Sequence, residues 1–198
     1  DNIKSGLKSK YSEEEIDEVI SDIQELIDAE ELYTKDTYEL YINDFKERET
    51  VVKALCLHIA HDCIIGDNCV LANAATFAGH VEVEDYAVVG GLTAVHQFTR
   101  VGRHAMIGGC SAVNQDVVPY MLSEGNKARA VYINIVGLQR RGFSDEQIKR
   151  LRELYKIIFK KKLKLEEALQ TVEREYGQYE EAQNLINFIR KSKRGNTR

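Results

Sequence analysis

Four of the five histidines lie close together in the sequence, where their side chains could supply a general base. His58, His61, His80 and His96 fall within 39 residues. A histidine titrates near neutral pH, and as a general base it typically accelerates a reaction by about 10²- to 10⁴-fold. Asp62 adjoins His61 and could orient its imidazole ring. This set suits acyl transfer to a hydroxyl group, but it suits the surface of a structural protein equally well.

A six-residue period decides which of these side chains lie above one another. Between residues 59 and 113 an aliphatic or aromatic residue returns at every sixth position, and a small or thin residue stands four positions after each. The first column is Ile59, Ile65, Leu71, Phe77, Val83, Val89, Val95, Val101, Ile107 and Val113, and the second is Cys63, Cys69, Ala75, Val81, Ala87, Thr93, Thr99, Ala105, Ser111 and Val117. Six fits neither a helix nor simple strand alternation. The pattern predicts short strands on successive flat faces, three to a coil of eighteen residues.

This pattern resembles the left-handed parallel β-helix of hexapeptide acyltransferases, and we expect about three coils over residues 58–118. Neighbouring coils hydrogen-bond as parallel strands, so each coil rises by about 4.8 Å. Counting by eighteen, His61 lies beneath Gly79, Gly79 lies beneath Gln97, and His80 is one position away. Such a site offers a base, a backbone N–H and a second donor. These are the parts needed for acyl transfer, namely a base for a hydroxyl nucleophile and donors for the tetrahedral oxyanion.

The segments on either side of the repeat differ from it in charge and in period. Residues 1–50 hold 16 acidic and 6 basic residues, whereas the remainder holds 16 acidic and 21 basic. We predict an acidic helical module over 1–57, with helices at 12–31 and 37–45. A connecting loop and strand segment should follow over 119–142. A C-terminal helical domain is expected over 143–198, beginning with a capping box of Ser144 and Gln147 and continuing with helices at 165–176 and 179–188.

The composition favours a cytoplasmic protein without a transmembrane segment. No apolar run approaches the length of about 20 residues that spans a bilayer, and no signal-peptide pattern opens the chain. The four cysteines form no Cys-x-x-Cys pair, and Cys63 and Cys69 belong to the small column, so we interpret them as core thiols. The basic clusters near the C-terminus either form a solvated face or dock an acidic carrier protein. We expect no nucleic-acid partner.

Several motifs resemble those of the UDP-N-acetylglucosamine O-acyltransferase family of lipid A biosynthesis. They are His58-Ile-Ala-His-Asp-Cys63, Leu71-Ala-Asn-Ala-Ala-Thr76, Ala78-Gly-His-Val81, Gly90-Gly91, Ala94-Val-His-Gln-Phe98, Gly108-Gly-Cys-Ser111, Gly125-Asn126 and Gly137-Leu-Gln-Arg-Arg-Gly-Phe143. The resemblance runs from about residue 58 to the C-terminus. The combination of the motifs at 94–98 and 137–143 is specific, because a related N-acyltransferase family shares the hexads but lacks both.

The resemblance implies a role for each matching position. His61 would be the general base that deprotonates the sugar 3-hydroxyl, and the Gly79 amide would stabilise the oxyanion. Substrate would be bound by His58, His80, Gln97, Gly109, Asn134 and Arg140, of which Asn134 and Arg140 would contact the nucleotide and Gly109 would shape the acyl groove. Lys127 stands where some members carry a histidine that limits this groove, so the acyl chain length stays open.

The same resemblance implies the partners. A 3-hydroxyacyl chain would come from acyl carrier protein, and UDP-N-acetylglucosamine would accept it in the first step of lipid A biosynthesis. Members of the family are homotrimers with active sites between neighbouring subunits, and the resemblance implies no cofactor.

A second resemblance covers the beginning of the chain. Residues of about 1–63 are similar to the N-terminal region of radical S-adenosylmethionine thioether peptide maturases, although the spacing from Cys63 to Cys69 does not fit their iron–sulfur cluster motif. Full members of the acyltransferase family have further coils before His58. The two resemblances meet in residues 58–63, which suggests a chimeric or truncated reading frame. The alternative is a genuine fusion in which the acidic module caps the end of the β-helix.

Two other classes of function remain open. The chain could be an inactive hexapeptide-repeat trimer or scaffold, or a metal enzyme that holds zinc between subunits. The spacing of His58, His61 and His80 does not match that of such zinc sites, so we expect no metal site.

Overall fold

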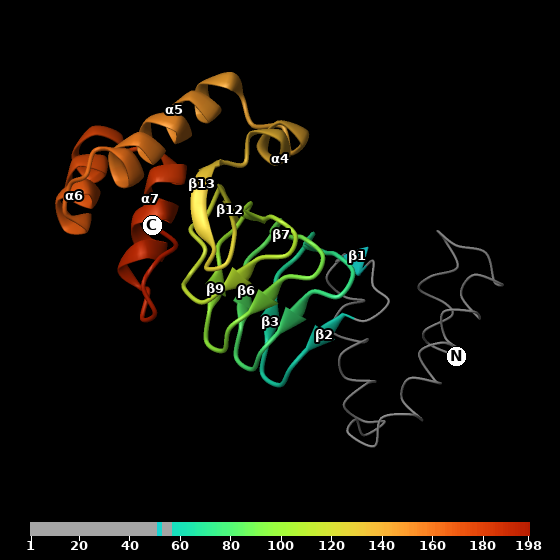
Figure 1. The fold of residues 1–198 in the computed structure, drawn as a ribbon. Coiled ribbons are helices and arrows are strands. Elements are labelled where there is room, and N and C mark those ends of the chain that lie inside the picture. Colours follow the sequence, from blue (N-terminus) through green and yellow to red (C-terminus); the bar gives the residue numbers. More distant parts are fainter. Residues whose placement is uncertain (1–50, 53–56) are drawn as a thin grey trace, which may run out of the picture. The chain divides into compact units, whose positions relative to one another are not determined.

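The computed structural model describes residues 51–52 and 57–198 (Figure 1). The chain divides into two compact units, Asp1–Glu49 and Thr50–Arg198. The acidic module with its helices at 12–31 and 37–45 lies outside the described residues. The four-part division of the chain, the chimeric origin and the junction at residues 58–63 therefore stay predictions.

A parallel β-helix of about four turns forms the central part of the described chain, as the six-residue period predicts. Its two-residue strands are β1 (Val51–Val52), β2 (His58–Ile59), β3 (Ile64–Ile65), β4 (Val70–Leu71), β5 (Thr76–Phe77), β6 (Glu82–Val83), β7 (Val88–Val89), β8 (Ala94–Val95), β9 (Arg100–Val101), β10 (Met106–Ile107) and β11 (Ala112–Val113). Together with the later strands β12 (Met121–Glu124) and β13 (Arg129–Ile133), they stack into three sheets, in the orders β1-β4-β7-β10-β12-β13, β11-β8-β5-β2 and β3-β6-β9. His58 pairs with Thr76, and Thr76 pairs with Ala94, so a coil is eighteen residues long.

The two columns of the sequence pattern line the inside of this β-helix. Every residue of the first column is buried, with Leu71, Phe77 and Val89 completely so. The second column is buried too, apart from the half-buried Cys63. The small residues fit where the chain turns from one face to the next. At every such corner from Asp62 to Cys110 one residue adopts a left-handed backbone conformation, for example Asp62 with a φ of 57°.

The stack is longer than the sequence pattern indicates, because strands without the hexad signature extend it. β1 pairs with β4 and lies outside the predicted bounds of 58–118. On the last coil, β12 (Met121–Glu124) pairs with β10 in parallel and with β13 (Arg129–Ile133) in antiparallel fashion. The segment after β13 forms a short helix, α4 (Ile135–Arg140), which the sequence pattern did not predict.

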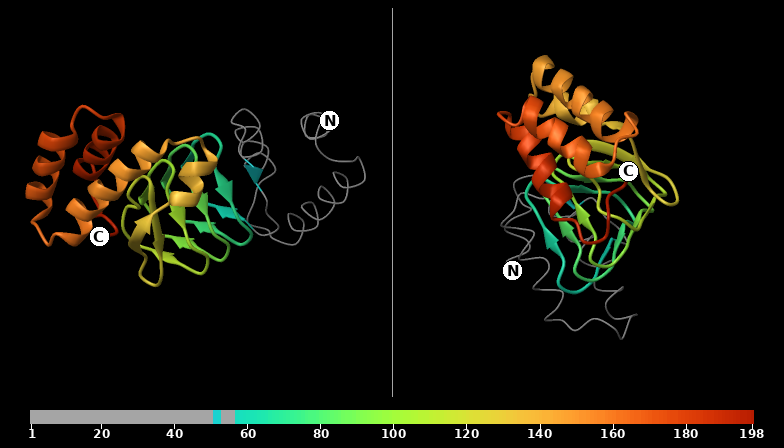
Figure 2. Two further views of the ribbon diagram at one scale, coloured as in Figure 1. Left: turned by 90° about the horizontal axis from the view of Figure 1, so that it is seen from above. Right: turned by 90° about the vertical axis from the view of Figure 1, so that its left-hand side faces the viewer.

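Helices cover the end of the β-helix that carries β12 and β13 (Figures 1 and 2). α5 (Asp145–Tyr155) begins with the predicted capping box of Ser144 and Gln147, and it is followed by a π-helical turn (Lys156–Lys160), α6 (Leu165–Tyr176) and α7 (Glu180–Arg190). Their core includes Leu151, Leu154, Leu169 and Leu185, all nearly or completely buried. Among these described helices none is long and apolar enough to cross a membrane.

Candidate functional site

The first corner of the β-helix holds the residues that the sequence motifs assigned to the chemistry. His61 Nδ1 lies 2.8 Å from Asp62 Oδ2. This hydrogen bond lowers the pKa of the Asp62 carboxyl below its usual value, so the carboxylate stays ionised and acts only as an acceptor. We therefore assign the imidazole proton to Nδ1, which donates to Asp62. His61 Nε2 is then left with its lone pair free to accept a proton.

Gly79 stands directly above His61 in the next coil, as counting by eighteen predicted. The His80 N–H donates to the His61 carbonyl at 3.0 Å and fixes this register. A Cβ built on Gly79 would lie 2.6 Å from His61 Nε2. Among the described residues the Gly79 N–H has no hydrogen-bond partner. The corner thus brings a proton acceptor and an unengaged amide donor together, and only glycine leaves room for the ring.

His80 joins this corner from the second coil. Its Nε2 lies 3.7 Å from Asp62 Oδ2, and its ring meets the His61 ring edge-on at a centroid distance of 5.0 Å. The Phe98 ring stacks on His80 at 4.7 Å with an interplanar angle of 7°. Asp62, His80 and Phe98 are eighteen residues apart and share the left-handed corner position. The sequence motifs did not point to this stack of corner residues, although counting by eighteen from Asp62 finds it.

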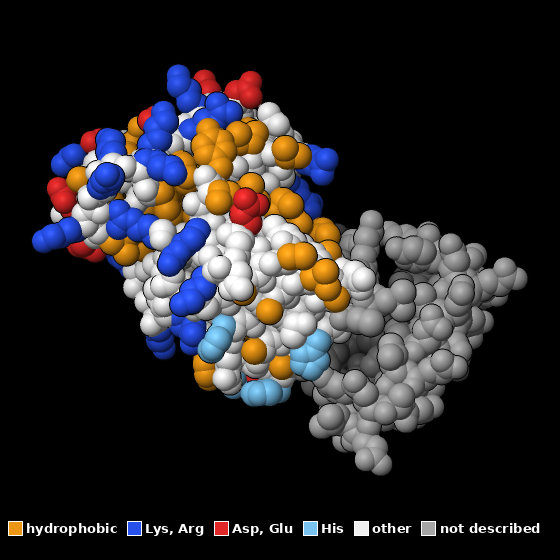
Figure 3. Space-filling model, viewed as in Figure 1, with side chains coloured by type: hydrophobic (Ala, Val, Ile, Leu, Met, Phe, Trp, Pro, Cys, Tyr) orange, Lys and Arg blue, Asp and Glu red, His pale blue; other side chains and the backbone are white. Residues whose placement is uncertain are grey.

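The corner is open to solvent, with side-chain exposures of 67% for His61 and 64% for Asp62. Histidine side chains gather along one edge of the β-helix in Figure 3. Gln97 is half-buried at the same corner one coil further on, and His58 is exposed on β2, the strand that leads into the corner. Five predicted site residues besides His58 therefore meet here: His61, Asp62, Gly79, His80 and Gln97.

The remaining predicted site residues lie away from this corner. Gly109 stacks above Gly91, which lies eighteen residues earlier. Because Gly109 follows Gln97 by two hexads, it lies two faces further round the β-helix. Asn134 is buried and caps α4, with its Oδ1 accepting from Gly137 N–H at 3.1 Å and its Nδ2 donating to the His104 carbonyl at 3.0 Å. Arg140 is exposed at the end of α4, and within the described residues its guanidinium has no partner. One chain therefore does not bring these residues to His61.

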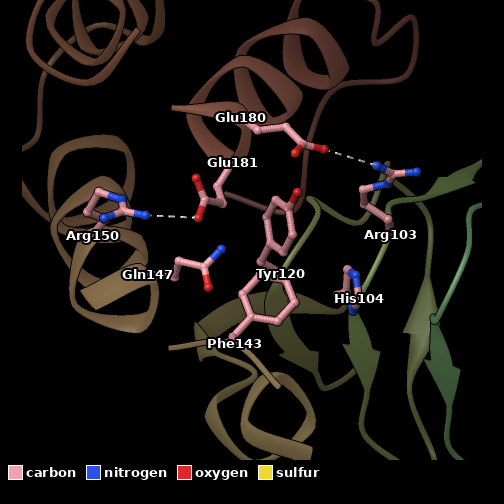
Figure 4. A pocket seen from close by; sticks show the side chains of 8 residues that line it. All are labelled: Arg103, His104, Tyr120, Phe143, Gln147, Arg150, Glu180 and Glu181. Carbon is pink, nitrogen blue, oxygen red and sulfur yellow. Dashed lines mark hydrogen bonds and ion pairs between the residues drawn. The ribbon is translucent and has the colours of Figure 1, made fainter. Parts of the chain in front are cut away.

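The fifth histidine, His104, lies in a pocket away from the His61 corner (Figure 4). The pocket measures about 200 Å³, and its charged side chains are paired, Arg150 with Glu181 at 3.3 Å and Arg103 with Glu180 at 3.9 Å. Burial lowers the pKa of His104 to about 4. A neutral ring in an aromatic stack with paired charges around it indicates a structural role.

Known sequence families and relatives match the β-helix and the helices that follow it. A sequence family described as "Udp N-acetylglucosamine O-acyltransferase; Domain 2" matches residues 116–197. The acyl-[acyl-carrier-protein]–UDP-N-acetylglucosamine O-acyltransferase of Nautilia profundicola is 48% identical over 143 residues, which are 70% of this chain and 53% of the relative. The protein of the same name from Burkholderia mallei is 46% identical over 70% of this chain and 55% of the relative.

Solved structures of UDP-N-acetylglucosamine acyltransferases also align with most of this chain. The UDP-N-acetylglucosamine acyltransferase of Campylobacter jejuni aligns with a TM-score of 0.68 at 42% identity, over 74% of this chain and 58% of that one. The Francisella novicida enzyme aligns with a TM-score of 0.70 at 36% identity, over 74% and 55%. The chain thus spans about half the length of the curated relatives it matches. By sequence and by fold, the β-helix and C-terminal helices of this chain belong to the UDP-N-acetylglucosamine O-acyltransferase family.

Proposed function

We propose that the protein is an acyltransferase that moves a 3-hydroxyacyl chain from acyl carrier protein to the 3-hydroxyl of UDP-N-acetylglucosamine, the first step of lipid A biosynthesis. The observation that carries the proposal is the geometry at Gly79, a residue with an unengaged N–H among the described residues, whose backbone lies against the Nε2 edge of an imidazole oriented by Asp62. The names of the relatives supply the substrates.

The proposed reaction uses His61 first as a base and then as an acid. His61 Nε2 takes the proton of the sugar hydroxyl while the oxygen attacks the thioester carbonyl, and the carbonyl π electrons move to its oxygen. The Gly79 N–H donates to that oxyanion. Collapse of the tetrahedral intermediate breaks the carbon–sulfur bond, and the imidazolium returns its proton to the leaving thiolate. The ionised Asp62 stabilises the imidazolium between the two steps.

Substrate binding would use the groups that the chain leaves available. The exposed guanidinium of Arg140 suits a phosphate of the nucleotide, because its planar fork can donate two parallel hydrogen bonds. His58, His80 and Gln97 would hold the sugar and the acyl chain close to His61, and Gly109 would shape the acyl groove. The Asn134 side chain caps a helix in this structure, so it would reach the nucleotide only by exchanging one of these hydrogen bonds.

The site would be completed in a homotrimer. An exposed His61 corner in one chain, with Gly109 at another corner and Arg140 at the end of α4, supports active sites formed between neighbouring subunits. Mixing His61→Ala and Arg140→Ala chains tests this. If the two residues meet across an interface, mixed trimers contain intact sites and recover activity, whereas no recovery would contradict the shared site.

The proposed compartment of the protein is the cytoplasm.

A transfer assay with UDP-N-acetylglucosamine and a panel of 3-hydroxyacyl carrier proteins tests the function. We expect His61→Ala to reduce the rate by about 10²- to 10⁴-fold. Asp67→Ala is the matched control, because Asp67 takes the equivalent turn position one hexad further on. Equal rates for His61→Ala and the unmodified chain would remove the assignment. Absence of UDP-sugar binding in calorimetry would favour the inactive scaffold instead.

A further inference from the structure

The His61 corner gathers three groups that can bind a metal ion. His61, Asp62 and His80 each offer one ligand atom, and these atoms lie within 4.8 Å of one another. His61 Nδ1 and Asp62 Oδ2 are 2.8 Å apart, and His80 Nε2 lies 3.7 Å from the same carboxylate oxygen. Within residues 51–52 and 57–198 this is the one such cluster. It differs from the histidine set weighed in the sequence, because Asp62 takes the place of His58.

The distances and the ligand types fit a zinc-like ion. Zinc–nitrogen and zinc–oxygen bonds of about 2.0–2.1 Å in a tetrahedral site place neighbouring ligand atoms about 3.3 Å apart. The observed 2.8 and 3.7 Å bracket that value. Two imidazoles and a carboxylate are ligands that zinc accepts, and water can fill the fourth position because the corner is open to solvent. We propose that His61, Asp62 and His80 bind a divalent transition-metal ion, with Zn²⁺ as the best match.

The surroundings hold two of the ligands in place. Phe98 stacks flat on the His80 ring and restricts its rotation. Asp62 and His80 are fixed by backbone turns with φ values of 57° and 59°. The neighbouring Cys63 is not part of the site, since its thiol contacts the Ala78 carbonyl at 3.2 Å and burial raises its pKa.

Metal binding has a direct consequence for the base. An ion on His61 Nδ1 takes the place of the proton that Nδ1 donates to Asp62. The one proton of the neutral ring then moves to Nε2, which faces Gly79 and can no longer accept a proton. Zn²⁺ would therefore inhibit the transfer reaction. This consequence rests on the proposed function, whereas the binding itself does not.

Calorimetry with Zn²⁺, and absorption spectroscopy with Co²⁺ as a probe, test the site on the full chain. Asp62→Asn and His80→Asn are the chosen variants, because asparagine tolerates the left-handed conformation of both positions. We expect each to weaken Zn²⁺ binding by at least about 10-fold, the lower end of what loss of a supporting group costs a metal site. His96→Asn, the same change at an exposed histidine outside the cluster, should leave the affinity unchanged.

The outcomes separate the two proposals. Zn²⁺ binding with equal affinity to all four proteins, or no binding at all, would overturn the metal site whatever the enzymatic activity. Binding that depends on Asp62 and His80 supports the site even in a chain that transfers no acyl group. In an active chain, Zn²⁺ should inhibit with a midpoint equal to its dissociation constant, and a chelator should restore the rate.

Discussion

The Gly79 backbone lies against the edge of the His61 ring, so a Cβ on Gly79 would stand 2.6 Å from Nε2 and 2.7 Å from Cε1. Both distances are far below an ordinary van der Waals contact. The missing side chain therefore makes room for the imidazole beside a backbone amide that has no hydrogen-bond partner among the described residues. One residue serves the placement of the base and the stabilisation of the oxyanion.

Gly79→Ala should displace the His61 ring without unfolding the β-helix. We expect transfer to fall by at least about 10²-fold, as when one oxyanion donor or the base is lost. The melting temperature of Gly79→Ala should also fall, because the methyl group clashes with the ring. In a His61→Ala background the same substitution should cost no stability. A similar loss in both backgrounds would mean that the methyl group meets something other than His61.

Asp62→Asn should slow the reaction while the fold is retained. An asparagine cannot hold the Nδ1 proton as a carboxylate does, so the ring loses its preferred tautomer and its support as an imidazolium. A buried orienting carboxylate can contribute about 10⁴-fold, and solvent screening at this exposed pair reduces the expected loss in kcat to about 10- to 100-fold. Steady-state kinetics at saturating substrates measures it. An unchanged kcat would show that Asp62 does not orient the base.

The stability of the protein should fall as the pH decreases from about 6.5 towards 4. Burial lowers the pKa of His104 to about 4 from its ordinary value of 6.5, so the unfolded chain takes up this proton before the folded one. The sign is therefore a loss of stability on acidification, complete below about pH 4. His104→Phe keeps the aromatic stack with Tyr86 and Tyr120 but cannot titrate.

Thermal denaturation across this pH range compares the two proteins. The His104→Phe protein should show a smaller fall in melting temperature, and His96→Phe should behave like the unmodified chain. Parallel curves for all three would contradict the low pKa of His104. An NMR titration gives a second measurement, in which the resonance lost in His104→Phe should have its midpoint near pH 4.

Phe77→Ala should strongly destabilise the β-helix. Phe77 is completely buried in the first column, where its ring fills the inside of a coil. Large-to-small changes of this kind cost about 3–5 kcal/mol because they leave a cavity. Urea denaturation measures the change in the free energy of unfolding. Phe77→Leu is the control and should cost much less, because leucine leaves a smaller cavity than alanine. An equal cost for both would show that the loss of stability does not depend on the volume removed.

Much of the fold could be predicted from the sequence because its determinants are local and periodic. One inward residue per hexad, with a small residue near each corner, determined the coil of eighteen residues and placed His61 under Gly79. The Ser144 capping box also involves only neighbouring residues, and α5 begins there. β1 and α4 were missed because neither carries the hexad period. The π-helical turn after α5, Lys156–Lys160, has no counterpart among the elements that the sequence predicted.

The sequence alone therefore determined the central β-helix, the position of Gly79 one coil above His61, and the candidate base. Only the tertiary structure decided how the other side chains meet. It set the corner residues Asp62, His80 and Phe98 in contact, placed Gly109 at another corner and Arg140 at the end of α4, buried Asn134 and half-buried His104. The physical reason is that backbone hydrogen bonds fix the register of stacked coils from their period. Ring stacking and side-chain burial also depend on contacts between segments that the six-residue period does not relate to one another.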